Sequence, residues 1–175
     1  MSENAANARI QGLRILAVDD EPDILETIVD MLDSATVDCA RSYQEAIERL
    51  SPGESRTPAN VKYDLAILDI MGVDGMGLLS QTVNQHIPTV MLTAHAMNPQ
   101  TLKASILNGA LSYLPKEELA NLAEHINDVL EAVEKGQSTW KRLFTRMGKF
   151  FEKDFGPAWT SDDPEFWKYY YGPMF

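Results

Sequence analysis

Five short, mostly apolar runs alternate with segments whose apolar residues recur every three or four positions. The runs cover residues 13–18, 36–40, 65–68, 88–92 and 111–114. Short apolar runs of this length are typical of buried strands. Apolar residues that recur every three or four positions, as they do in the segments between the runs, are typical of amphipathic helices. Five strand-then-helix units with short connections favour an α/β fold, with a doubly wound parallel sheet of five strands covered by helices on both faces.

Several helix boundaries are marked by residues with a known preference for helix ends. Pro22 suits a first helical turn, and Asn98 precedes Pro99 in the same way. Ser42 with Glu45 three residues later predicts a capping box before the second helix. The fifth helix is predicted from Leu119, through apolar residues that continue to position 133.

Four of the apolar runs end in residues suited to metal and phosphate chemistry. Asp19 and Asp20 follow the first run, and Asp69 follows the third. Thr93 comes directly after the fourth run, and Lys116 is separated from the fifth run by Pro115. The carboxyl ends of neighbouring parallel strands meet at one edge of a sheet. We therefore expect one crevice with three carboxylates, a hydroxyl and an ammonium group, a set that suits a divalent cation and a phosphoryl group.

Each of these residues also has an ordinary structural interpretation. Acids before Pro22 favour a helix N-terminus, an acid such as Asp69 can begin a turn, Thr93 suits a strand and Lys116 suits a solvated surface. Next to a divalent cation, however, the carboxylate of Asp69 could attack phosphorus and form an aspartyl phosphate. The order of four such strand ends carries more weight than any single residue.

The chain resembles the receiver domain of two-component response regulators over roughly residues 12–135. The resemblance rests on Leu-Ala-Val-Asp-Asp-Glu-Pro at 16–22, Leu-Ala-Ile-Leu-Asp-Ile-Met-Gly at 65–72, Val-Met-Leu-Thr-Ala at 90–94 and Gly-Ala-Leu-Ser-Tyr-Leu-Pro-Lys at 109–116. It implies a flavodoxin-like fold with strand order 2-1-3-4-5. It also implies that Asp69 is the phosphoacceptor and that Asp19, Asp20, Asp69 and the backbone carbonyl of Met71 bind Mg²⁺.

The same resemblance implies a role for three further residues. Thr93 and Lys116 would contact the phosphoryl group, and Tyr113 would swing inward as a switch when Thr93 moves toward the phosphate. The protein would then be a signalling switch that takes its phosphoryl group from a histidine kinase or a phosphotransfer protein. It would catalyse only its own phosphorylation and dephosphorylation, and we do not class it as an enzyme.

Two departures from the receiver pattern lie close to these residues. The turn Met71-Gly72-Val73-Asp74-Gly75 is shorter than usual and lacks a proline, and Pro115-Lys116-Glu117 replaces the usual Lys-Pro pair. Neither departure removes a reactive group. Both bear on loop geometry and on the lifetime of the phosphoryl group. Met71 and His95 would flank the site, where they could affect the access of water, although His95 could equally be an exposed residue without a role.

Two other functions remain open from the sequence. A magnesium-dependent phosphatase-like enzyme could use Asp69 as its nucleophile, but it would need a second acid two residues later, where the chain has Met71. A phosphate-independent interaction domain of the same fold is the other alternative. The complete set of acids, Thr93 and Lys116 argues against it.

Composition narrows the classes of partner and the cellular location. The net charge of −11 argues against DNA binding, which depends largely on Lys and Arg. A single cysteine, Cys39, excludes an internal disulfide and is typical of a reducing compartment. Residues 1–11 are polar and are expected to be flexible, and they lack the pattern of a signal peptide. These features predict a cytoplasmic protein.

The segment 136–175 differs in kind from the rest of the chain. Residues 1–134 contain 8 Lys or Arg against 21 Asp or Glu, whereas residues 135–175 contain 7 against 5. An amphipathic helix is predicted from Trp140 to a stop at Gly156, followed by an aromatic-rich tail. This extension could pack on the receiver domain, dock a downstream protein or a second copy in a homodimer, or contact a membrane peripherally.

Overall fold

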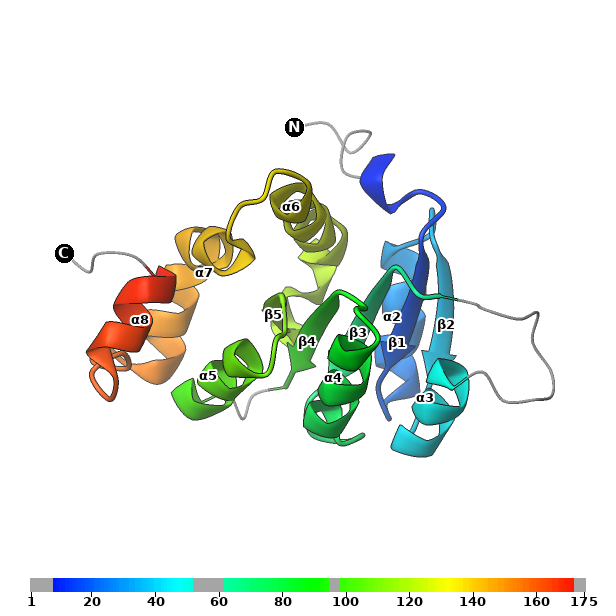
Figure 1. The fold of residues 1–175 in the computed structure, drawn as a ribbon, viewed down its shortest axis with the longest axis horizontal. Coiled ribbons are helices and arrows are strands. Elements are labelled where there is room, and N and C mark those ends of the chain that lie inside the picture. Colours follow the sequence, from blue (N-terminus) through cyan, green and yellow to red (C-terminus); the bar gives the residue numbers. More distant parts are fainter. Residues whose placement is uncertain (1–7, 52–61, 95–97, 172–175) are drawn as a thin grey trace.

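The computed structural model describes residues 8–51, 62–94 and 98–171 (Figure 1). Its strands are β1 Arg14–Val18, β2 Thr36–Ala40, β3 Leu65–Asp69, β4 Thr89–Thr93 and β5 Ser112–Pro115. Its α-helices are α2 Pro22–Met31, α3 Tyr43–Leu50, α4 Gly75–Asn84, α5 Pro99–Leu107, α6 Leu122–Glu134, α7 Thr139–Phe155 and α8 Pro164–Tyr171. The five strands thus fall on the five apolar runs, within a residue or two at their ends.

The strands form one fully parallel sheet in the order β2-β1-β3-β4-β5, which confirms the predicted fold. Ile15 in the inner strand β1 pairs with Val37 of β2 on one side and with Leu65 of β3 on the other. The chain moves outward from β1 to β2 and then returns to place β3 on the opposite side of β1. Ligands of open α/β sheets bind where the strand order reverses in this way, beyond the carboxyl ends of the strands.

Helices cover both faces of the sheet. Helices α2 and α6 pack together on one face, and α3, α4 and α5 lie on the other (Figure 1). Strands enclosed on both sides are apolar along their whole length. All five residues of β3 and of β4 are buried, and this is why they read as continuous apolar runs rather than as alternating ones.

The helix ends show which local predictions were correct. The hydroxyl of Ser42 accepts the backbone N–H of Glu45, as the capping box predicts, but the Glu45 carboxylate accepts the N–H of Arg41 instead of that of Ser42. The predicted start of the fifth helix, Leu119, is three residues too early. Residues Lys116–Asn121 form a 3₁₀ helix that includes Leu119, and α6 follows it.

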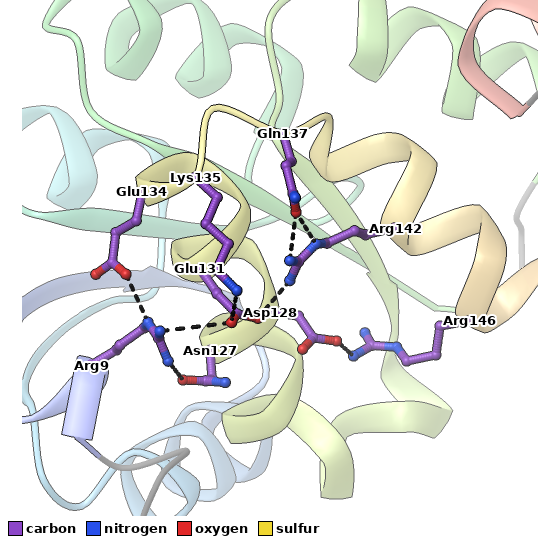
Figure 2. Close-up of polar contacts among 9 residues, drawn as sticks. All are labelled: Arg9, Asn127, Asp128, Glu131, Glu134, Lys135, Gln137, Arg142 and Arg146. Carbon is purple, nitrogen blue, oxygen red and sulfur yellow. Dashed lines mark hydrogen bonds and ion pairs between the residues drawn. The ribbon is translucent and has the colours of Figure 1, made fainter.

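Residues 8–10 lie within the N-terminal segment that we expected to be flexible, yet they form a helical turn. The side chain of Ile10 is fully buried in the core. Arg9 donates from Nε to Glu134 at 3.0 Å and from Nη1 to Asn127 at 3.3 Å, both on α6 (Figure 2). The packed structure therefore begins before residue 12.

The C-terminal extension packs on the receiver-like body at the β5 edge of the sheet (Figure 1). The indole N–H of Trp140 donates to the backbone carbonyl of Ala110 at 2.9 Å, and the hydroxyl of Thr139 donates to that of Leu111. At the other end of the extension, Lys103 on α5 forms an ion pair of 2.6 Å with Asp163. The extension is thus tied to β5, to the turn before it and to α5.

An aromatic cluster joins α7 to α8 and is continuous with the hydrophobic core of the body. Phe144 lies at its centre, with five aromatic rings whose centroids are 5.1–6.3 Å away: Trp140, Phe151, Trp159, Trp167 and Tyr171. The extension therefore packs on the body, as one of our three hypotheses held. The membrane hypothesis required this aromatic face to be exposed, and it is buried. None of the described helices is both long and apolar enough to span a bilayer.

Polar and charged residues of α6 connect it to the N-terminal helical turn and to α7 (Figure 2). Glu131 pairs with Arg142 of α7 at 2.7 Å and with Lys135 at 2.6 Å, while Asp128 pairs with Arg146. The Lys135 and Arg142 contacts lower the pKa of Glu131 to about 2. Part of the positive charge of the extension is thereby neutralised by acids of the body.

Replacing Phe144 by alanine should destabilise the protein by about 3–5 kcal/mol, because a buried ring at the centre of a cluster leaves a cavity. Urea denaturation followed by near-ultraviolet circular dichroism measures the loss. Tyr169→Ala is the matched control, because the Tyr169 side chain is 70% exposed and its loss should cost less than about 0.5 kcal/mol. Equal effects of the two substitutions would contradict a packed extension.

Candidate functional site

The acids predicted at the strand ends lie together at the carboxyl edge of the sheet. Asp19 and Asp20 follow β1, and Asp69 is the last residue of the neighbouring strand β3. One carboxylate oxygen from each acid lies within 4.8 Å of the other two. Asp19 and Asp69 are buried, whereas Asp20 is exposed, so the cluster opens to solvent on one side.

Lys116 lies among these acids at the end of β5. Its Nζ atom is 2.7 Å from Asp19 Oδ2, 2.8 Å from Glu21 Oε1 and 3.3 Å from Asp69 Oδ1. Burial alone would lower the pKa of Lys116, but the adjacent carboxylates of Asp19 and Glu21 outweigh burial and raise it. Lys116 is therefore a fixed positive charge that three carboxylates share. Glu21 was not among the predicted site residues.

Asp19 is a buried carboxylate with two polar partners. Its Oδ1 accepts the backbone N–H of Glu21 at 2.9 Å, and its Oδ2 lies 2.7 Å from Nζ of Lys116. Burial raises the pKa of Asp19, and Lys116 offsets part of that shift. A hard divalent cation suits a buried carboxylate oxygen that has two further carboxylates nearby. The residues present therefore fit Mg²⁺.

The turn after β3 fixes the carboxylate of Asp69. The backbone N–H of Gly72 donates to Asp69 Oδ2 at 3.0 Å, and Asp74 caps α4 from the left-handed region with φ 52°. The side chain of Met71 is 73% exposed at the mouth of the site. The proposed metal contact of the Met71 carbonyl stays a prediction.

Thr93 ends β4, one residue beyond Leu92, which pairs in register with Asp69. The strand end therefore places Thr93 beside the acids, although its hydroxyl donates to the carbonyl of Ala94 at 3.1 Å. A turn of this hydroxyl away from Ala94 is required before it can serve a phosphoryl oxygen. His95, which we expected to flank the site, lies outside the described residues.

A family model for the response regulator receiver domain matches residues 15–127, more than half of the chain. The chain belongs to the receiver domain family. Among curated proteins, the two-component response regulator ARR12 of Arabidopsis thaliana is 32% identical over 124 residues, which make up 66% of this chain and 20% of ARR12. The transcriptional regulatory protein TcrA of Mycobacterium tuberculosis is 31% identical over 117 residues, or 63% of this chain and 43% of TcrA. The chain thus spans less than half the length of these relatives.

Solved structures show the same receiver fold. A receiver domain protein from Clostridium thermocellum has a TM-score of 0.57 and 25% identity, covering 70% of this chain and 97% of its own. A response regulator from Thermotoga maritima has a TM-score of 0.58 and 20% identity, covering 69% and 98% respectively.

Tyr113, the candidate switch of this receiver domain, is fully buried in β5. Burial raises the pKa of its hydroxyl to about 12, and the nearby Thr93 opposes part of this shift. The ring is therefore already inside the protein, and its role as a switch stays a prediction.

A polar connection between the receiver domain and the extension escaped the sequence analysis. Ser112 of β5 lies 3.0 Å from Nε2 of the buried His125 of α6, and the other ring nitrogen of His125 contacts Arg146 of α7. Because a guanidinium only donates, His125 Nδ1 must accept and Nε2 must carry the proton toward Ser112. Residues on three separate elements form this connection, and no local motif marks it.

Lowering the pH should weaken this receiver domain through His125. Burial and then the charge of Arg146 lower the pKa of His125 from 6.5 to about 3, although Asp128 pairs with that guanidinium. Between these values the unfolded chain binds a proton that the folded protein does not, so stability falls as the pH drops below about 6.5, by at most about 1.4 kcal/mol per pH unit.

Urea denaturation at about pH 7 and about pH 5 measures this dependence. In His125→Gln the loss of stability over this range should be smaller than in the wild type, because the group that titrates is gone. The exposed His86 provides the control, and His86→Asn should follow the wild type. If His125→Gln also kept the full pH dependence, another group would be responsible.

Proposed function

We propose that this receiver domain accepts a phosphoryl group on Asp69 from a histidine kinase or a phosphotransfer protein, in the presence of Mg²⁺. The observation that supports it most is the convergence of Asp19, Asp20 and Asp69 with Lys116 at one edge of the sheet. The receiver-family membership supports the same chemistry. The single cysteine favours a reducing, cytoplasmic compartment for this exchange.

In the proposed reaction, an oxygen of Asp69 attacks phosphorus while the P–N bond of the donor histidine breaks. The imidazole leaves with the electron pair and takes a proton from solvent. Asp19 and Asp20, with Asp69 and the Met71 carbonyl, would hold Mg²⁺, which neutralises charge on the phosphoryl oxygens when bound. Gly72 N–H keeps the Asp69 carboxylate in a fixed orientation before the attack.

Lys116 and Thr93 would respond to the product. Lys116 pairs with Asp69 at 3.3 Å before the reaction, and a charge-assisted hydrogen bond to a phosphoryl oxygen can replace that pair afterwards. The Thr93 hydroxyl would leave the Ala94 carbonyl and donate to a second phosphoryl oxygen. This movement takes place next to the buried Tyr113.

The two rival functions gain less support. A phosphatase-like enzyme would need an acid two residues after Asp69, and the turn presents the exposed Met71 there. A phosphate-independent interaction domain would not need three acids held within 4.8 Å of one another around a buried lysine. We therefore propose a switch that modifies only itself, rather than an enzyme.

Incubation with Mg²⁺ and a small phosphodonor should add one phosphoryl group to the wild-type protein, as measured by intact mass. Asp69→Asn should remove the adduct, because an amide cannot act as the nucleophile. Asp74→Asn is the matched control, since Asp74 lies on the same turn but caps α4, and it should keep the adduct. A wild type that stays unmodified, or an adduct that survives in Asp69→Asn, would refute the proposal.

We further propose that the C-terminal extension receives the signal. Ser112 precedes Tyr113 in β5 and is linked through His125 to Arg146 of α7. The start of α7 is also bonded to the chain just before β5, through Trp140 and the Ala110 carbonyl. A shift of β5 would therefore displace α7. Self-association or docking of a downstream protein through the outer surface of the extension remains part of this proposal.

Phosphorylation should change amide hydrogen exchange in α7 and α8, because a shift of β5 would move α7 with it and rearrange the contacts around the extension. Hydrogen exchange with mass spectrometry, with and without the phosphodonor, measures the change. Asp69→Asn with the donor controls for effects of the reagent, and α3 serves as an internal reference far from β5 (Figure 1). An extension whose protection does not change would contradict this route for the signal.

A further inference from the structure

The short turn between β3 and α4 brings the backbone of Gly72 against the carboxylate of Asp20. A Cβ atom added at Gly72 would overlap Oδ1 and Cγ of Asp20 and would lie 2.7 Å from Oδ2. Asp20 comes from the end of β1, so this contact joins the two strand ends that supply the acids. The sequence shows only that the turn is short, not what it touches.

Movement of the Asp20 side chain is the least costly way to relieve this contact. The backbone of Gly72 has no positive φ, so alanine is conformationally acceptable there. The group it would meet is the end of an exposed, flexible side chain, which can rotate away at little cost to the fold. Rotation would, however, carry the Asp20 carboxylate out of the group of three oxygens that lie within 4.8 Å.

Gly75 on the same turn shows the contrast. A Cβ at Gly75 would overlap the carbonyl oxygen of Asp69 and lie 2.8 Å from both its carbonyl carbon and the Cα of Ile70. These are backbone atoms, which no rotamer change can move aside. Glycine at 75 therefore serves the path of the turn, whereas glycine at 72 serves the position of a carboxylate.

We propose that Gly72 is a positioning residue for divalent-cation binding, which it supports by leaving room for the Asp20 carboxylate beside Asp69. Its N–H fixes Asp69 Oδ2, and its missing side chain admits Asp20, so one residue orients two of the three acids. This inference deepens the proposed function and rests on it. Residues that orient metal ligands typically contribute about 10–100-fold to metal affinity.

Calorimetric titration of the unphosphorylated full chain with Mg²⁺ tests the proposal. Gly72→Ala should weaken binding by about tenfold or more, with a melting temperature in metal-free buffer close to that of the wild type. Asp20→Asn should weaken binding as well. The double variant should be no weaker than Asp20→Asn alone, because the alanine acts through Asp20 and the two effects are not additive.

Gly77→Ala is the matched control. A Cβ at Gly77, in the first turn of α4, would overlap the carboxylate of Asp74, which is the same kind of contact but involves none of the three acids. Its Mg²⁺ affinity should equal that of the wild type. Wild-type affinity in Gly72→Ala, a loss that persists in the Asp20→Asn background, or a marked fall in metal-free melting temperature would each overturn the role of Gly72.

The outcomes also separate this inference from the proposed function. If Gly72→Ala binds Mg²⁺ normally while the wild type is phosphorylated on Asp69, the role of Gly72 is wrong and the receiver function stands. If the wild type itself shows no Mg²⁺ binding, both the metal-dependent mechanism and the role of Gly72 fail.

Discussion

The concentration of negative charge at the carboxyl edge of the sheet is the constraint on which the rest of the site depends. Parallel strands deliver Asp19 and Asp69 side by side, both nearly without solvent, and like charges in such a place repel strongly. Lys116 is the counter-charge, shared among Asp19, Asp69 and Glu21. One ammonium group cannot balance these acids, so the site favours a divalent cation. Any further negative charge at the site would change which carboxylates Lys116 pairs with.

The extension depends on the same sheet through its edge. β5 is an edge strand, and exposed strand edges are covered in stable proteins. Here α7 packs beside β5, and its first residues bond to the carbonyls of Ala110 and Leu111 just before that strand. The aromatic cluster around Phe144 then joins α7 to α8. The extension is therefore an addition that contacts the receiver core at β5, the strand that contains the candidate switch Tyr113.

The parts of the structure that could be predicted are those set by local physics or by the parallel sheet. Strands buried on both faces appear as apolar runs, and parallel strands must end at one edge, so the meeting of Asp19, Asp69 and Lys116 followed from the sequence. Helix α8 was missed because its aromatics were taken as a tail, although Pro164 at its first turn marked a helix start. The side-chain partners of Ser112 could not be predicted, because they depend on how separate helices pack.

The buried contact between His125 and Ser112 bears on how a signal could leave the sheet. His125 is held neutral between β5 and α7, so neither neighbour can move away without leaving a buried polar atom unpaired. Such a penalty favours joint movement of strand and helix over separate movement. A change at Thr93 should therefore either shift β5 and the extension together or be absorbed before it reaches β5. In the proposed route from Asp69 through β5 to α7, the turn at Gly72 lies beside the phosphoacceptor, and α7 is the last element.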